Sequence, residues 1–247
     1  MYAMASAIGE GSKFLNTFST KQGKVLFIQA DESKSNCAHK INIINVSDNV
    51  DFLFKNIGFN KLNTKTIQDL SSLIGETYDV VFLDSITTLL TGGKYSYKDA
   101  EFALPLYELN DLACEKNIPI IFSSHLKKPD HNERIRVIKH DVMGNQSIFA
   151  AASDVWSIHK STKPNFEDHY LLSCLKGRNC DEDSLYNIQG DQETFRWYFH
   201  SSGNNQLSPN KENLCRAKIL ELLQKTNNFL NVKKISNNID FSEQHTR

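Results

Sequence analysis

Residues 78–85 have the sequence Tyr78-Asp79-Val80-Val81-Phe82-Leu83-Asp84-Ser85, in which four apolar residues are followed by an acid and a small polar residue. Such a short apolar run, rich in Val and Phe, predicts a strand buried on both faces of a parallel sheet. Asp84 falls where this strand leaves the sheet, and ligand crevices in open α/β sheets lie at the carboxyl ends of the strands. A carboxylate there can hold Mg²⁺, directly or through water, beside a nucleotide phosphate. Alternatively, Asp84 and Ser85 only cap the next turn.

Two further apolar runs end in polar residues. Lys24–Ala30 leads into Asp31 and Glu32, and Ile118–Phe122 leads towards His125. We expect these side chains to meet Asp84 at a common rim, where a triphosphate could sit. The simpler alternatives are that the two acids favour the N-terminus of the following helix through its dipole, and that His125 is an ordinary surface residue.

Helical patterns separate the predicted strands, among which Val50–Phe54 is a fourth. The predicted helices are Ser33–Ile43, Lys65–Ile74 and Lys98–Lys116. Pro105 lies inside the last of these, so either the helix is kinked or its regular part begins near Pro105. Before the first strand, Met1–Ile8 is compatible with a helix that Gly9 and Gly11 stop. This alternation predicts an α/β fold with a mostly parallel sheet and helices on both faces.

The second half of the chain has a different pattern. A short helix is expected over Gly144–Ala152, and four short strands should form a meander at the sheet edge: Val155–His159, Tyr170–Leu175, Leu185–Ile188 and Phe195–Phe199. Residues 200–210 are rich in Ser, Asn and Gly and indicate a linker. Residues 211–247 have the spacing of a partial helix–turn–helix module, with seven basic and four acidic residues and so a net charge of +3. Such a module could bind duplex DNA.

Composition narrows the class of protein. The chain has 247 residues, of which 40% are hydrophobic and 23% charged, and its net charge is −1, so any nucleic-acid surface must be local. The five cysteines are scattered and form no Cys-x-x-Cys pair, which favours a reducing cytoplasm over a disulfide framework or zinc site. No apolar run approaches the ~18 residues of a membrane span.

Taken in order, the motifs over about residues 1–199 resemble those of RecA-like ATPases, and in particular the RepA-like and DnaB-like helicase branch of the AAA family ATPases. By this resemblance residues 78–85 form the Walker B strand, with Asp84 serving Mg²⁺ and Ser85 beside the nucleotide. The strand before Asp31 would end in the catalytic acid. Asp31 stands where Glu is usual and Glu32 follows it, so either could be the general base. His125 would take the place of the sensor that contacts the γ-phosphate.

The resemblance also implies partners. The segment Lys127–Asp141 would be a mobile loop that faces single-stranded DNA inside a homo-oligomer, most simply a hexamer; its basic residues are Lys127, Lys128, Arg134, Arg136 and Lys139. Lys176 and Arg178 would reach the γ-phosphate bound by the neighbouring subunit. The simpler alternatives are a solvated loop and an ordinary basic turn.

The phosphate cradle Gly-x-x-x-x-Gly-Lys-Ser/Thr is absent from the sequence. We therefore expect the chain to begin inside the first helix of the fold, with its P-loop lost before Met1, and to be truncated at its other end too. The intact protein would bind ATP and Mg²⁺, whereas this chain would turn over negligibly.

The sequence thus predicts a cytoplasmic ATPase that acts as a DNA motor or replication protein. Alternatives are a nucleotide-responsive DNA-binding regulator and a KaiC-like or recombinase-like ring or filament scaffold. A Ser/His/Asp hydrolase built from Ser85, His125 and Asp84 is a more distant option, because the Gly-x-Ser-x-Gly elbow is missing.

Overall fold

A computed structural model describes most of the first 202 residues. The described positions are 1–55, 59, 61–90, 100–126, 137, 141–142, 146–160, 169–178, 180–181, 184–191 and 193–202. The five basic residues of the predicted DNA-facing loop (Lys127, Lys128, Arg134, Arg136 and Lys139) lie outside the described residues, as do most of the predicted linker and all of the helix–turn–helix segment. The domain boundaries therefore stay a prediction. Residues 1–202 form one compact unit.

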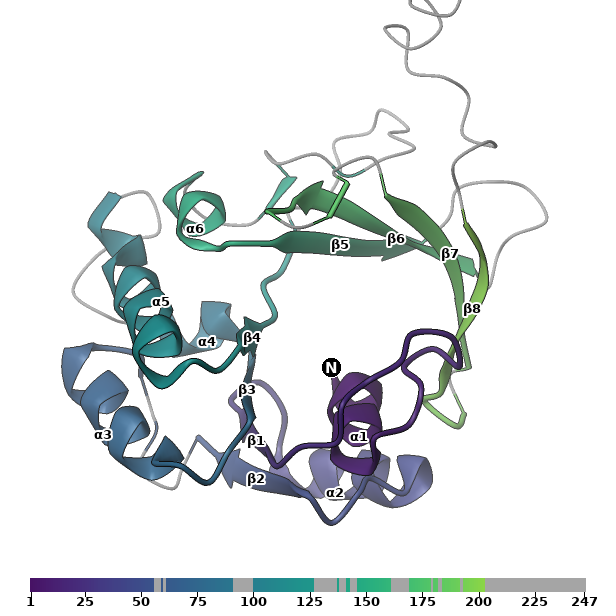
Figure 1. Cartoon of the computed structure of the whole chain (residues 1–247), viewed down its shortest axis with the longest axis horizontal. Coiled ribbons are helices and arrows are strands. Elements are labelled where there is room, and N and C mark those ends of the chain that lie inside the picture. Colours follow the sequence, from purple (N-terminus) through teal and green to yellow (C-terminus); the bar gives the residue numbers. More distant parts are fainter. Residues whose placement is uncertain are drawn as a thin grey trace, which may run out of the picture. The chain divides into compact units, whose positions relative to one another are not determined.

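A parallel sheet of four strands forms the centre of the fold, in the order β2-β1-β3-β4 (Figure 1). The strands are β1 (Val25–Gln29), β2 (Val50–Phe54), β3 (Val80–Asp84) and β4 (Ile120–Phe122). The register sets Gln29 opposite Asp84 in the central pair. The predicted parallel α/β sheet, with β3 in its interior, is confirmed.

Successive side chains of β1 and β3 enter two separate hydrophobic clusters. Leu26 and Ile28 belong to the cluster that includes residues of helices α3 and α5, whereas Val25 and Phe27 belong to the cluster beneath α1 and α2. Figure 1 shows the two pairs of helices on opposite faces of the sheet. Because successive side chains point to opposite faces of a strand, an unbroken apolar run is what a sheet covered on both faces requires.

Two of the helices, α2 and α3, begin at side-chain caps. They are α1 (Tyr2–Glu10), α2 (Lys34–Ile44), α3 (Thr64–Ile74), α4 (Ile86–Leu90), α5 (Leu104–Lys116) and α6 (Gln146–Ala151), with a 3₁₀ turn, η1, at Ala100–Ala103. Ser33 accepts from the backbone N–H of Asn36 at the start of α2, and Asn63 forms a capping box with Thr66 at the start of α3. Pro105 lies in the first turn of α5, so the regular helix begins beside the proline and is not kinked by it.

One helix end differs from expectation. Gly9 does not stop the first helix, which continues to Glu10 and ends at Gly11 with a left-handed φ of 70°. Gly9 is buried, and a Cβ at this position would lie 2.9 Å from Cβ of Ser47. This glycine therefore serves close packing of α1 against the segment before β2, and the left-handed ending falls on Gly11 instead.

The four later strands form a second sheet, antiparallel and in sequence order. They are β5 (Val155–Lys160), β6 (His169–Lys176), β7 (Leu185–Gly190) and β8 (Trp197–Ser202). The predicted meander is therefore present, but it pairs within itself and does not extend the edge of the parallel sheet. The edge strand β4 has only three residues, which offers little backbone for a further strand to pair with. No helix within the described ranges is long and apolar enough to cross a bilayer.

Candidate active site

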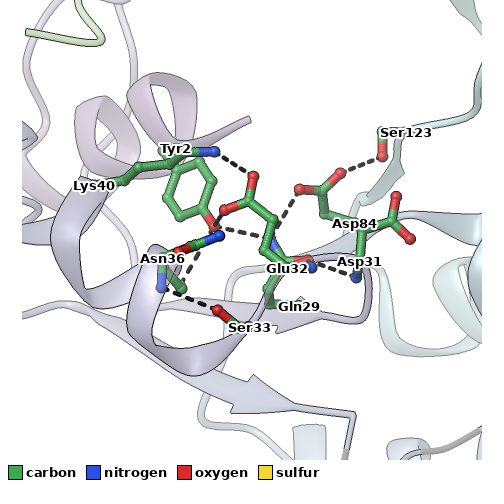
Figure 2. A network of polar contacts seen from close by, with 10 residues as sticks. Tyr2, Gln29, Asp31, Glu32, Ser33, Asn36, Lys40, Asp84 and Ser123 are labelled. Carbon is green, nitrogen blue, oxygen red and sulfur yellow. Dashed lines mark hydrogen bonds and ion pairs between the residues drawn. The ribbon is translucent and has the colours of Figure 1, made fainter. Parts of the chain in front are cut away.

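A buried glutamine joins the two central strands at their carboxyl ends. The Gln29 Nε2 donates to Oδ2 of Asp84 at 3.0 Å and to the Tyr2 hydroxyl at 2.8 Å, and the side chain is fully buried. Its Oε1 accepts from the backbone N–H groups of Asp31 and Glu32, at 2.9 and 3.2 Å. All four hydrogen bonds that the amide can make are therefore formed, as a buried polar group requires. Figure 2 shows Gln29 at the centre of this network.

The carboxylate of Asp84 is held from both sides. While Gln29 donates to one oxygen, the Ser123 hydroxyl donates to Oδ1 at 2.5 Å from the residue that follows β4. Asp84 is half-buried at the end of β3, so the register of three neighbouring strands decides where its oxygens lie. Carboxylate and hydroxyl oxygens are ligands that suit Mg²⁺, which commonly keeps several waters and binds through one or two carboxylates plus phosphate. Asp84 could thus supply one carboxylate to such an ion bound with phosphate, whereas the described residues contain no group of three or more His, Cys, Asp or Glu side chains that could hold a metal by themselves.

Asp31 lies on the same rim and links two strand ends. Its carboxylate accepts from the Thr88 hydroxyl and lies 3.3 Å from Nε2 of His125. Thr88 belongs to α4, directly after β3, whereas His125 follows β4. The backbone N–H of Asp31 is 3.3 Å from the carbonyl oxygen of Asp84. The structure therefore brings Asp31, Asp84 and His125 together, as the sequence predicted for their rim.

Glu32 points away from this rim. Its carboxylate forms an ion pair with Lys40 of α2 and accepts from the Tyr2 hydroxyl of α1 at 3.4 Å. Both side chains of the ion pair are about three-quarters buried, at 27% and 26% exposure. Figure 2 shows the carboxylates of Asp31 and Glu32 on opposite sides of Gln29. Two adjacent acids thus occupy different environments.

On the Glu32 side of the network, the Tyr2 hydroxyl and the Cys37 thiol have raised pKa values. Burial raises the pKa of the Tyr2 hydroxyl, and its hydrogen bond to Cys37 adds to the shift. Burial also raises the pKa of the Cys37 thiol, which is fully buried under α1. Both groups therefore stay protonated and neutral at physiological pH, because a charged form would lose its hydration.

Ser85 caps the turn that follows Asp84. The Ser85 hydroxyl lies 3.4 Å from the Thr88 backbone N–H and is 1% exposed, and the peptide bond between Asp84 and Ser85 is cis. The capping that the sequence left open as an alternative is therefore present for Ser85. Since Ser85 bonds to Thr88 and His125 bonds to Asp31, the nucleophile–base pair of a Ser/His/Asp hydrolase is not formed among the described residues.

Lys176 is the last residue of β6 in the second sheet, and Arg178 lies in the turn that follows it. The Lys176 Nζ donates to the carbonyl oxygens of Phe149, Ala150 and Ala152, at 3.2, 3.0 and 2.6 Å. Phe149 and Ala150 belong to the last turn of α6 and Ala152 follows it directly, so the ammonium group lies at the C-terminal end of the helix, where the helix dipole favours a cation. The Arg178 backbone N–H donates to Oδ1 of Asp154 at 3.0 Å. Within this chain, Lys176 therefore caps a helix.

Several residues of the network were missing from the sequence-based site. Gln29, Ser123, Thr88, Tyr2 and Lys40 all contact the predicted acids. The sequence did carry one signal for Gln29, because it is the single polar residue in an otherwise apolar strand. A polar residue at such a position needs a partner across the sheet.

Comparison with known proteins finds a similar fold among solved structures but no match among family models or curated proteins. No protein-family model matches the chain, and no curated protein matches it. Among solved structures, the RadB recombinase is similar, with 15% identity over 72% of this chain and 80% of that chain and a TM-score of 0.51. At this identity the likeness concerns the fold alone, and it supports the RecA-like architecture predicted from the motifs.

Proposed function

We propose that this chain forms part of the ATP-binding and ATP-hydrolysing core of a DNA motor or replication protein of the RepA/DnaB-like helicase type, and that hydrolysis needs the phosphate cradle which this sequence does not contain. One observation carries the proposal. Asp84, Asp31 and His125 come from three neighbouring strand ends of a RecA-like sheet and share one polar network. Such an edge is where α/β sheets bind ligands, and acids placed there suit phosphoryl transfer.

In this proposal Asp84 holds Mg²⁺, and Gln29 and Ser123 orient its carboxylate. Mg²⁺ bound with ATP would neutralise charge on the transferring phosphoryl group. The two hydrogen bonds fix the carboxylate before any ligand arrives, so little reorganisation is needed on binding. Ser85, which caps α4, lies next to this carboxylate in sequence.

We assign the general base to Asp31 rather than to Glu32. Asp31 contacts His125 and Thr88 on the rim, whereas the carboxylate of Glu32 is paired with Lys40 on the other side of Gln29. A base must lie within hydrogen-bonding reach of the water it activates, and Asp31 lies on the same side as Asp84. His125, bound to the base, would relay the state of the γ-phosphate.

Assembly and DNA contact complete the proposal. Lys176 and Arg178 would act on the γ-phosphate of a neighbouring subunit in a hexamer. For Lys176 this means exchanging three carbonyl contacts at α6 for a phosphate. The basic loop 127–141 would track the backbone of single-stranded DNA, and the tail 211–247 could bind duplex DNA.

The test uses protein made from its complete reading frame and measures ATP hydrolysis with and without single-stranded DNA. We expect Asp84→Asn to abolish hydrolysis and Asp31→Asn to slow it by about 100-fold or more, whereas Glu32→Gln keeps most of the rate. Hydrolysis that survives Asp84→Asn would exclude this site. A rate that falls with Glu32→Gln but not with Asp31→Asn would move the base to Glu32. Strand displacement driven by ATP separates a motor from a regulator or a scaffold.

A further inference from the structure

Two thiols face each other at the turn that follows β6. Sγ of Cys174, in β6, lies 3.2 Å from Sγ of Cys180. Cys174 is fully buried, whereas Cys180 is partly exposed. The sequence places the two cysteines on either side of Lys176-Gly177-Arg178, so a bond between them would close a short loop around both basic residues.

The backbone of this turn passes directly beside both sulfur atoms. A Cβ on Gly177 would lie 2.1 Å from Sγ of Cys180 and 3.1 Å from Sγ of Cys174. Any side chain at position 177 would therefore displace Cys180 from its place beside Cys174. Glycine is the residue that lets the two thiols share this space.

Hydrogen bonds hold both sides of the turn in place. The backbone N–H of Cys174 donates to the Ser184 carbonyl at 3.0 Å, and that of Ser184 donates to the Asp181 carbonyl at 2.9 Å. On the other side, Arg178 is bonded to Asp154 through its backbone. These backbone contacts hold residues on both sides of the two thiols.

We propose that Cys174 and Cys180 form a reversible disulfide in response to peroxide. A disulfide has an S–S length of about 2.05 Å, so the sulfurs must approach by about 1.2 Å from their separation of 3.2 Å. The more exposed Cys180 gives up its proton, and its thiolate attacks a peroxide oxygen. The O–O bond breaks, Cys180 becomes a sulfenic acid, and the departing hydroxide takes up that proton and leaves as water. The Cys174 thiolate then attacks that sulfur and expels hydroxide, which takes up a proton.

The overall reaction balances: two thiols and one hydrogen peroxide give one disulfide and two waters. A dithiol reductant reverses it. If the proposed function holds, the bond also restrains Lys176 and Arg178, so that oxidised protein hydrolyses ATP more slowly than reduced protein. The disulfide itself is measured without any activity assay, so its failure and the failure of the ATPase proposal are distinguishable.

The experiment treats the whole chain with hydrogen peroxide, alkylates the remaining thiols after unfolding, and digests with trypsin. Cleavage after Lys176 and Arg178 separates the peptide containing Cys174 from the peptide containing Cys180, so only a disulfide can keep them together. We expect a linked pair that is two hydrogens lighter than the sum of its parts and that disappears with dithiothreitol. Oxidising a mixture of ¹⁵N-labelled and unlabelled chains should give linked pairs of one isotope only.

Cys180→Ser should abolish the linked pair, whereas Cys114→Ser, at an exposed position on α5, should leave it unchanged. Because Cys180 is partly exposed, its replacement tests the proposal even if Cys174→Ser fails to fold. Full alkylation of both cysteines after a peroxide treatment that oxidises Cys114 would overturn the proposal. Linked pairs of mixed isotope would also overturn it, because they show a bond between chains.

Discussion

The Gln29 side-chain amide donates to the Asp84 carboxylate across the two central strands, at 3.0 Å and from a fully buried position. The same amide nitrogen also donates to the Tyr2 hydroxyl. Gln29, which was absent from the site predicted from the sequence, therefore orients the Asp84 carboxylate. The contribution of Gln29 to stability can be measured without any ligand.

Gln29→Glu keeps the acceptor oxygen for the N–H groups of Asp31 and Glu32 but replaces the donor that faces Asp84. Two carboxylates then lie side by side in a buried place, so we expect the free energy of unfolding at pH 7 to fall by about 1–3 kcal/mol. Urea unfolding measures the change, and the loss should shrink at pH 5, where one carboxyl can hold a proton. The exposed Gln68→Glu on α3 adds the same charge and should have little effect. Equal losses for the two variants would contradict the assigned contact.

Both side chains of the Lys40–Glu32 ion pair are about three-quarters buried. We therefore expect this pair to stabilise the fold more than a fully exposed pair would. In a double-mutant cycle with Lys40→Gln and Glu32→Gln, we expect a coupling energy of about 1 kcal/mol at low salt. Thermal or urea unfolding of the four proteins gives this value. Lys34→Gln, at an exposed position on the same helix, serves as the control and should show no coupling to Glu32.

Stability should fall in alkaline solution because of Tyr2 and Cys37. Burial holds the pKa of each group above its ordinary value, 10.0 for Tyr2 and 9.0 for Cys37. Well below pH 9 both groups are protonated in the folded and unfolded chains, and their contribution is fully present. As the pH rises further, only the unfolded chain ionises, and the contribution is progressively lost.

Tyr2→Phe removes one of these titrations while keeping the ring that stacks on Phe27. We expect the decline of unfolding free energy above pH 10 to become shallower than in the parent protein, even though the variant is less stable at neutral pH. Tyr107→Phe, which is 42% exposed, should leave the slope unchanged. Parallel slopes for the parent and Tyr2→Phe would show that the phenol does not titrate with folding.

Gly9→Ala tests the close approach of α1 to the segment before β2. Alanine ordinarily favours a helix over glycine, but its Cβ would lie 2.9 Å from Cβ of Ser47. We expect the clash to outweigh the higher helix propensity of alanine and to lower the free energy of unfolding, measured in urea, by about 1–3 kcal/mol. Ser35→Ala, exposed on α2, is the control for a helical change to alanine without a clash. A stabilised Gly9→Ala protein would show that the two segments can separate at little cost.

The parallel sheet could be predicted from the sequence because its strands are short apolar runs that end in acids or polar residues. Val80–Leu83 illustrates this, since burial on both faces leaves no polar position in the run. The predicted rim followed from the topology, because parallel strands present their carboxyl ends at one edge. The second sheet was predicted as strands, but its separation from the first depends on pairing between distant segments, which local patterns do not encode.

The details of the site could not be predicted for the same reason. Asp31 and Glu32 are adjacent in sequence and chemically alike, and only the positions of Lys40 and His125 distinguish them. Ser123 reaches Asp84 because β4 lies beside β3. This contact depends on the register of the two strands, which the amino-acid composition does not specify. Gly9 is likewise interpreted as the end of a helix from the sequence alone, because the sequence does not show that Ser47 packs against it.

The four bonds of the Gln29 amide leave it a single orientation. Rotating it by half a turn would set its hydrogens against the N–H groups of Asp31 and Glu32 and its oxygen against a carboxylate. The first helix, the acid pair and the end of β3 are thereby linked through one planar group. We expect a displacement of α1 that shifts Tyr2 to move the Gln29 amide and, with it, the hydrogen bond that orients the Asp84 carboxylate.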